Sequence, residues 1–349
     1  MGDISQRKQD HLDLCATDEV AFRKQTNLLQ CVTLMHQSLP ELSLDDLDLS
    51  IDFLGKKLRA PIFIAAMTGG TENAAEVNQT LSAIAERRGY GFGLGSQRAM
   101  HRSPDTAWTY AVRDHAPTTV LLGNVGAVQA RDLPTKTLAD LVQDVGADAL
   151  CVHLNPAMEV VQPEGDRDFR GCLDSIRRLV AELPVPVVAK ETGSGISQRC
   201  ASQLRSVGVT HVDVSGAGGT SWVGVETLRA TGGGRELGEA LWDWGVPTAA
   251  SVHYCSQAGL TTIATGGIKR GLDVARAIAL GASAAGIARP VLQALRAGGA
   301  EGADAFLQGV ERELAAVMLL TGSRTIRDLR TAPKFVRGEL KDWMNCEAL

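Results

Sequence analysis

Short apolar runs alternate along the chain with longer stretches in which apolar residues recur at helical spacing. Eight runs stand out, most of them followed by glycine or a small polar residue: residues 61–67, 90–94, 119–122, 149–154, 185–190, 210–214, 261–264 and 284–288. Strands buried on both faces read as continuous apolar runs, and strands that alternate with helices pair in parallel. The pattern therefore predicts an α/β fold in which eight strand and helix units close into a TIM (β/α)8 barrel.

The spacing of the runs supports a closed barrel. Successive starts lie about 25 to 35 residues apart, except after residue 210, where a gap of about 50 residues holds a glycine-rich insertion at 227–245. The alternative, a doubly wound sheet, needs fewer strands and a glycine-rich dinucleotide turn after the first of them. The first run lacks that turn, so the barrel is favoured.

Three parts of the chain surround this barrel, and we expect them to form a single domain, residues 1–349. Residues 1–60 are an N-terminal extension that caps the barrel, and the acidic, leucine-spaced segment 42–61 is expected to pair as a hairpin across the barrel's bottom. Residues 61–323 form the barrel itself. The charged tail, residues 324–349, is expected to pack outside it.

Composition narrows the class of protein. The 349 residues are 44% hydrophobic and 21% charged, which excludes a disordered or fibrous chain. With 40 acidic and 35 basic residues the net charge is -5, which argues against a non-specific nucleic-acid binder. The 7 cysteines form no CxxC pair, and no apolar run reaches the roughly 18 residues of a membrane helix. We expect a cytoplasmic protein with no membrane or nucleic-acid partner.

Glycine is in excess, at 37 residues, and much of it follows the predicted strands. In a barrel, chemistry lies on the loops that leave the carboxyl ends of the strands. Those loops are MTGGT (67–71), GSQR (95–98), GNVGA (123–127), residues 153–169, KETGSGIS (190–197), SGAGGTSW (215–222), TGGIKRG (265–271) and ARP (288–290).

Two loops and one lysine point to a bound anion. The segments 265–268 and 286–290 follow the last two runs, where barrels commonly bind phosphate through backbone N–H groups. Lys190 ends the fifth run and is expected to face an anion, because an unpaired buried ammonium is costly. A flavin fits, since a lysine stabilises the negative charge of its reduced ring. The alternative is a pair with a carboxylate such as Glu191.

Further polar residues at strand ends could bind such a ring or its substrate. Thr68, Ser96, Asn124 and Thr220 would donate or accept hydrogen bonds, although each type is also common in turns and caps. Arg98 is expected to point inward, toward a phosphate or carboxylate.

The N-terminal extension carries its own charged cluster. Arg7 and Lys8, with His11 four residues after Arg7, can share one face of a short helix and present positive charge; a solvated tail is the alternative. Glu159 can hold a magnesium ion shared with substrate phosphates, or can be a helix-start glutamate. His153 and Glu226 are candidates for proton transfer or positioning, with a structural histidine as the competing interpretation.

Taken in order, these segments resemble the type 2 isopentenyl diphosphate isomerases, a flavoprotein family of isoprenoid biosynthesis. The resemblance spans nearly the whole chain and rests on RKQDH (7–11), MTGG, GSQR, HLNPAME (153–159), KETGSGIS, SGAGGTSWVGVE (215–226), WGVPT (244–248), TGGI and ARP. It implies an isomerase that interconverts isopentenyl and dimethylallyl diphosphate by adding and removing a proton. Reduced FMN would stabilise a state with carbocation character and carry the proton.

The resemblance also implies which residues act. FMN would be held by Ala66, Met67, Thr68, Ser96, Asn124, Lys190, Ser215, Thr220, Gly266, Gly267, Ala288 and Arg289. The substrate would meet Arg7, Lys8, His11, Ser96, Gln97, Arg98, Asn155 and Met158, with magnesium on Glu159, and the catalytic set would be His153, Met158, Trp222 and Glu226. NADPH would reduce the flavin. The family is typically a homo-oligomer, a tetramer or octamer.

One position departs from the family pattern. Where the family has glutamine before the metal-binding glutamate, this chain has Met158, and a thioether cannot donate a hydrogen bond or carry a proton. Three interpretations stay open: Gln162, four residues on, supplies the amide from the same helix face; the flavin does the proton work alone; or the enzyme acts on another prenyl diphosphate.

Two other classes compete. An FMN-dependent oxidoreductase of the α-hydroxy-acid oxidase type shares the barrel, the phosphate turn and the lysine, but it needs a histidine and an arginine after the sixth strand, where this chain reads SGAGGTSWVGVE. A non-catalytic flavin-binding barrel is the third possibility, to which Met158 lends some support.

Overall fold

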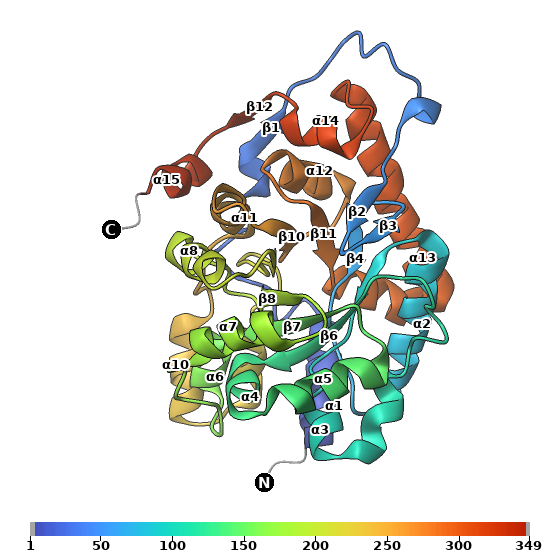
Figure 1. Cartoon of the computed structure of the whole chain (residues 1–349). Coiled ribbons are helices and arrows are strands. Elements are labelled where there is room, and N and C mark those ends of the chain that lie inside the picture. The colour runs from blue at the N-terminus through green and yellow to red at the C-terminus, as the bar shows by residue number, and fades with distance from the viewer. Residues whose placement is uncertain (1–3, 347–349) are drawn as a thin grey trace.

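The computed structural model describes residues 4–346 and has at its centre a closed barrel of eight parallel strands (Figure 1). In barrel order from the first, the strands are β4 (Ile62–Ile64), β5 (Gly91–Gly93), β6 (Leu121–Gly126), β7 (Ala149–Leu154), β8 (Val187–Glu191), β9 (His211–Asp213), β10 (Thr261–Thr265) and β11 (Ala284–Ile287). The barrel closes where β11 pairs with β4. All eight predicted runs overlap a barrel strand, so the TIM barrel prediction is confirmed.

Helices follow the strands and surround the barrel (Figure 1). They are α2 (Glu72–Arg88), α3 (Arg98–Arg102), the 3-10 segment η3 (Pro104–Tyr110), α4 (Ala127–Asp132), α5 (Thr135–Val145), α6 (Pro156–Val161), α7 (Cys172–Glu182), α8 (Gln198–Ser206), α9 (Trp222–Arg229), α10 (Gly233–Leu241), α11 (Thr248–Gln257), α12 (Gly271–Ala279) and α13 (Arg289–Leu320). The insertion at 227–245 forms the end of α9 and the whole of α10. No helix of residues 4–346 combines the length and apolar character that a bilayer crossing demands.

Helix α2 illustrates how local sequence sets these elements. The hydroxyl of Thr71 accepts a hydrogen bond from the backbone N–H of Ala74 and caps the first turn. Buried Leu81 and Ala85 lie four residues apart on the face turned to the barrel. Gly89 ends the helix with φ of 68°, a left-handed conformation that glycine adopts without strain. A helix of defined length therefore carries the chain back to begin the next strand.

The N-terminal extension closes the bottom of the barrel. The expected hairpin is present as β2 (Ile51–Phe53) and β3 (Lys56–Leu58). The side chains of Phe53 and Leu58 are each 2% exposed and pack with the barrel residues Phe63, Val120, Leu122, Ala149, Cys151, Val188, Ile263 and Ala284. This plug fills the lower interior with apolar side chains, so polar chemistry is confined to the opposite end of the barrel.

The first and last described helices lie on different parts of this scaffold. Helix α1 (Ile4–Cys15) covers the carboxyl ends of the strands, as the cavity described below shows. The tail packs outside, as expected: β12 (Lys334–Val336) pairs with β1 (Val32–Leu34), and α15 (Glu339–Asn345) lies on α11. Two 3-10 segments, η1 (Leu29–Cys31) and η2 (Leu44–Asp46), and helix α14 (Ile326–Thr331) complete the described elements.

Candidate active site at the barrel mouth

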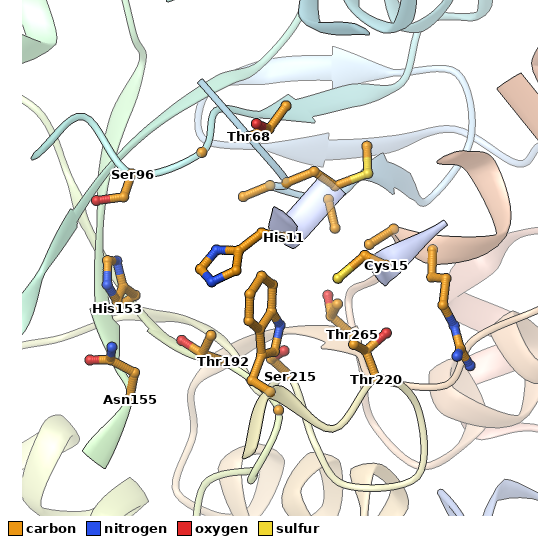
Figure 2. A pocket seen from close by; sticks show the side chains of 18 of the residues that line it. His11, Cys15, Thr68, Ser96, His153, Asn155, Thr192, Ser215, Thr220 and Thr265 are labelled. Atoms are coloured by element: carbon orange, nitrogen blue, oxygen red, sulfur yellow. The ribbon is translucent and has the colours of Figure 1, made fainter. Parts of the chain in front are cut away.

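A cavity opens at the carboxyl ends of all eight strands, with α1 along its side. Every βα loop contributes to its wall. In Figure 2, Ser96, His153 and Asn155 lie on one side of the cavity and Thr220 and Thr265 on the other, with His11 between them. Residues far apart in sequence therefore face one space, which is where barrel enzymes carry their chemistry.

Helix α1 presents one face to this cavity. Lys8, His11, Leu12 and Cys15 line it, and their spacing of three and four residues is that of a single helical face. The ring of His11 meets the ring of Trp222 edge-on, with centroids 5.1 Å apart. The expected helix is thus present, and it lines the cavity rather than forming a solvated tail.

One end of the cavity is rich in cations. Arg7, Lys8 and Arg98 all line it, and the buried Nε atoms of the two arginines have no hydrogen-bond partner among residues 4–346. Burial, and secondly the charge of Arg7, lowers the pKa of Lys8 to about 7. Burial likewise lowers the pKa of Arg7. Clustered cations with unused donors are what a polyanionic ligand would satisfy.

Glu159 stands beside this cation cluster and is the predicted metal ligand. It is 7% exposed and lines the cavity. Its Oε1 accepts a hydrogen bond of 2.8 Å from Nδ2 of Asn155, and its Oε2 accepts one of 2.8 Å from the backbone N–H of Asp166. Within residues 4–346 no three His, Cys, Asp or Glu side chains group as a metal site. Magnesium fits only as an ion shared between this carboxylate and ligand phosphates, a mode that magnesium favours.

His153 is held as a neutral ring. Its Nδ1 lies 2.8 Å from Oδ1 of Asn124, and Nδ2 of Asn124 donates to the carbonyl of Leu94. Burial, followed by the charges of Lys190 and Arg98, lowers the pKa of His153 to about 3. At neutral pH the ring can orient a ligand or share a hydrogen bond, but it is not an imidazolium acid.

Gln97 departs from its expected role. The sequence resemblance places it against the substrate, yet it is 0% exposed and absent from the cavity wall. Its Nε2 donates to the carbonyl of Leu141 at 2.8 Å, and its Oε1 accepts from the backbone N–H of Asn124 at 2.9 Å. Gln97 therefore links β6 to α5 through hydrogen bonds outside the cavity. Gln97 belongs to the GSQR loop yet points away from the cavity, because its amide finds backbone partners in the core.

Lys190 has a carboxylate partner, though not the one considered from the sequence. Its Nζ lies 3.6 Å from Oδ2 of Asp213 and donates to the backbone carbonyl of Glu191 at 2.7 Å. The carboxylate of Glu191 instead accepts backbone N–H groups of the loop after β8, including those of Thr192 and Gly193 at 2.6 Å each. Burial raises the pKa of Glu191 to about 7. Lys190 still lines the cavity, so its charge remains available to a ligand.

The other end of the cavity is a glycine cradle. A Cβ on Gly219 would lie 2.3 Å from the backbone nitrogen of Gly267, so the loops after β9 and β10 touch only because both positions lack side chains. Gly266 and Gly267 have φ of 109° and 72°, and both line the cavity. The first turn of α13 adds Ala288 and Arg289 at the same end. Backbone approach and a helix N-terminus suit a phosphate.

One buried hydroxyl beside the cradle lacks a partner. Oγ1 of Thr265 has no hydrogen-bond partner among residues 4–346, although the residue is only 7% exposed. Thr265 lines the cavity next to Ser215, whose φ of 33° is unusual for a residue other than glycine. An orphaned donor and a strained backbone at one place fit a bound polar group such as that of FMN.

Most residues named from the sequence line the cavity. They are Arg7, Lys8, His11, Ala66, Met67, Thr68, Ser96, Arg98, Asn124, His153, Asn155, Met158, Glu159, Lys190, Ser215, Thr220, Trp222, Gly266, Gly267, Ala288 and Arg289. Glu226 lies behind His11, and Gln97 lies away from the wall, as described above. The cavity wall also contains Leu12, Cys15, Gln129, Thr192 and Thr265, which the sequence does not single out as site residues. Helical spacing from Lys8 and His11 is the available signal for the first two, and the last two lie in strand-end loops already named.

Comparison with known proteins agrees with this geometry. The family model described as FMN-dependent dehydrogenase matches residues 2–133 and 132–335. Solved structures with the same fold include mandelate oxidase with (S)-2-phenylpropionate, at TM-score 0.67 and 20% identity, covering 95% of this chain and 97% of that one. A lactate oxidase of Pediococcus acidilactici has TM-score 0.69 and 15% identity, covering 96% and 93%. The fold and the matched family define a flavin-dependent TIM barrel enzyme.

Sequence relatives narrow the class. The isopentenyl-diphosphate delta-isomerase of Methanosarcina barkeri is 47% identical over 340 residues, which cover 96% of this chain and 92% of that protein. That of Methanothermobacter thermautotrophicus is 43% identical, covering 98% and 96%, and that of Thermococcus kodakarensis is 42% identical, covering 97% and 93%. The chain belongs to the isopentenyl-diphosphate delta-isomerase family, as its motifs indicated.

Proposed function

We propose that the protein is an FMN-dependent isomerase that interconverts isopentenyl diphosphate and dimethylallyl diphosphate in isoprenoid biosynthesis. The observation that carries the proposal is the division of one cavity into two ends: Arg7, Lys8 and Arg98 at one, the Gly266 and Gly267 cradle at the other. A diphosphate suits the first end and the phosphate of FMN suits the second.

The chain's own groups have distinct tasks in this proposal. The cations bind the diphosphate, and Glu159 would hold magnesium, which would offset the negative charge of the diphosphate. Neutral His153 and Asn155 orient the ligand from β7 and the loop after it. Trp222, with its ring against His11, covers the apolar part of the substrate and limits water access.

FMN, when bound and reduced, would supply an electron-rich ring that stabilises positive charge and can carry a proton. Its contacts would come from Ala66, Met67, Thr68, Ser96, Asn124, Lys190, Ser215, Thr220, Gly266, Gly267, Ala288 and Arg289. Lys190, paired with Asp213, keeps a positive charge near any anionic part of the ring. NADPH as the reductant, Mg²⁺ as the ion, a tetramer or octamer, and a cytoplasmic location complete the proposal.

An anaerobic assay tests the function. Purified protein with FMN, dithionite or NADPH, and magnesium is given isopentenyl diphosphate, and double-bond position is followed by proton NMR. Appearance of dimethylallyl diphosphate only with reduced flavin supports the proposal. FMN binding without conversion of either isomer contradicts it.

The runner-up is an α-hydroxy-acid oxidase, which shares the fold. The loop after β9, residues 214–221, carries no histidine or arginine to serve as base or carboxylate ligand. Oxygen consumption with lactate or mandelate is therefore expected to stay at background. Turnover of a longer prenyl diphosphate in place of isopentenyl diphosphate would instead indicate the diverged activity considered for Met158.

A further inference from the structure

Lys8 reaches the cavity from α1, and its ammonium is held by a phenol. Nζ of Lys8 donates to Oη of Tyr110 at 2.6 Å and to the backbone carbonyl of Ser96 at 3.1 Å. The same Nζ lies 5.2 Å from the centroid of the Tyr110 ring. Because an ammonium has three N–H donors, these two hydrogen bonds leave one for the cavity that Lys8 lines.

Tyr110 can hold the Lys8 ammonium in place because its own ring is buried and its hydroxyl is hydrogen-bonded. The residue is 0% exposed, and its hydroxyl donates to the carbonyl of Ser96 at 2.8 Å, which leaves its lone pairs for Lys8. Burial raises the pKa of Tyr110 above its usual range, so the phenol stays neutral and keeps its proton. A neutral phenol can orient an ammonium without cancelling its charge.

The surrounding backbone is built to admit this ring. A Cβ on Gly69 would lie 2.1 Å from Cε1 of Tyr110, and one on Gly70 would lie 3.3 Å from Nζ of Lys8. Next to the tyrosine, Oγ1 of Thr109 accepts from the backbone N–H of Gly70 at 2.8 Å, and the carbonyl of Thr109 accepts from Asn78 at 3.0 Å. The end of η3 is thus fastened to the loop after β4 and to α2.

We infer that Tyr110 is a positioning residue that fixes the Lys8 ammonium toward the diphosphate subsite while leaving its charge unpaired. This inference rests on the proposed function, since it assumes that the cation end of the cavity takes a diphosphate. Tyr110 touches no ligand in this assignment, because it is absent from the cavity wall. It acts through the Lys8 ammonium and through the carbonyl of Ser96, which both side chains share as a hydrogen-bond acceptor. A carboxylate in its place would neutralise the charge that binds the anion.

Titration calorimetry with inorganic pyrophosphate and magnesium, on the FMN-loaded full chain, tests the inference. Tyr110→Phe keeps the ring and removes the hydroxyl, and it should raise the Kd for pyrophosphate about 5- to 20-fold, while Lys8→Met raises it about 10- to 100-fold. The double variant should bind within about twofold of Lys8→Met, because the two side chains act as a unit. With isopentenyl diphosphate, Tyr110→Phe should raise KM and leave kcat nearly unchanged.

A matched control is available in Tyr90. It is also 0% exposed, but its hydroxyl donates to Glu311, away from the cavity. Tyr90→Phe should leave pyrophosphate affinity unchanged, and FMN affinity should be unchanged in both variants, which shows that the barrel mouth is folded. The inference is overturned if Tyr110→Phe binds pyrophosphate as tightly as the wild type does. It is also overturned if the losses in pyrophosphate binding free energy from Tyr110→Phe and Lys8→Met add in full in the double variant. If the wild type itself binds no pyrophosphate, the diphosphate proposal falls, and the role of Tyr110 falls with it.

Discussion

Nε2 of His11 lies 2.6 Å from Oε1 of Glu226, and this contact ties the N-terminal helix to the barrel. The Glu226 side chain is 1% exposed, and its Oε2 accepts a second hydrogen bond from Arg229 at 2.8 Å. Arg229 in turn pairs with Asp10, so α1 is joined to α9 at two points. A residue expected at the reacting end thus orients the helix that carries His11 and Lys8.

Glu226→Gln should keep the shape of this contact and remove its charge. Hydrogen bonds to charged groups contribute about 1.5–3 kcal/mol, so kcat/KM for isopentenyl diphosphate should fall about 10- to 100-fold. The control is Glu239→Gln, since Glu239 pairs with Arg23 but is 40% exposed, and solvent screening makes such pairs weak. Equal kcat/KM in the two variants would contradict a role for Glu226.

Thr265→Val should weaken FMN binding. The hydroxyl of Thr265 is buried without a partner among residues 4–346, and we expect it to meet the cofactor. Loss of one such hydrogen bond costs about 1 kcal/mol, or about fivefold in Kd, measured by quenching of flavin fluorescence. The Tm of the flavin-free protein should not fall, because the valine removes an unsatisfied polar atom.

Thr262 on the same strand is the control for this measurement. Its hydroxyl is fully buried and donates to the carbonyl of Leu260 at 3.0 Å, and it does not line the cavity. Thr262→Val should lower the Tm and leave the Kd of FMN unchanged in the protein that remains folded. If Thr262→Val weakens FMN binding and Thr265→Val does not, the flavin does not contact Thr265.

Gln162 should carry the amide function that Met158 lacks. Both line the cavity, and Oε1 of Gln162 accepts from Nη1 of Arg7 at 3.4 Å. Gln162→Leu should therefore lower isomerase kcat at least about 10-fold, and adding Met158→Gln should restore part of it. Unchanged kcat in Gln162→Leu would indicate that the flavin alone transfers the proton.

The charge of Lys8 should make ligand affinity depend on pH. Burial lowers its pKa to about 7, below its usual 10.5, so the free protein loses this positive charge as pH rises through 7. The ratio of pyrophosphate affinities, wild type over Lys8→Met, should be greatest at pH 6 and fall up to about 10-fold per pH unit above 7. Lys136→Met, at a lysine whose side chain is 84% exposed, should leave the profile unaltered. A constant ratio from pH 6 to 9 would rule out titration of Lys8.

Much of the barrel was predictable because its signals are local. The run 149–154 coincides with β7, while the run 119–122 covers only the beginning of β6, which continues to Gly126. The extension forms because Asn124 pairs with Cys151 on the neighbouring strand. Asn124 therefore stands within a strand, where its amide is fixed, rather than on a loop. Pairing with a neighbour decided the strand's length where glycine and asparagine weaken the apolar pattern.

The sequence by itself determined the alternation of strands and helices, the glycines at which two loops can touch, and the polar residues at strand ends. These follow from periodicity and from side-chain size, which act over a few residues. Only the tertiary structure decided that α1 lies over the mouth, that Lys190 pairs with Asp213, and that Gln97 turns into the core. Such choices depend on which buried partners the packing offers, and the partners lie on other strands and helices of the barrel.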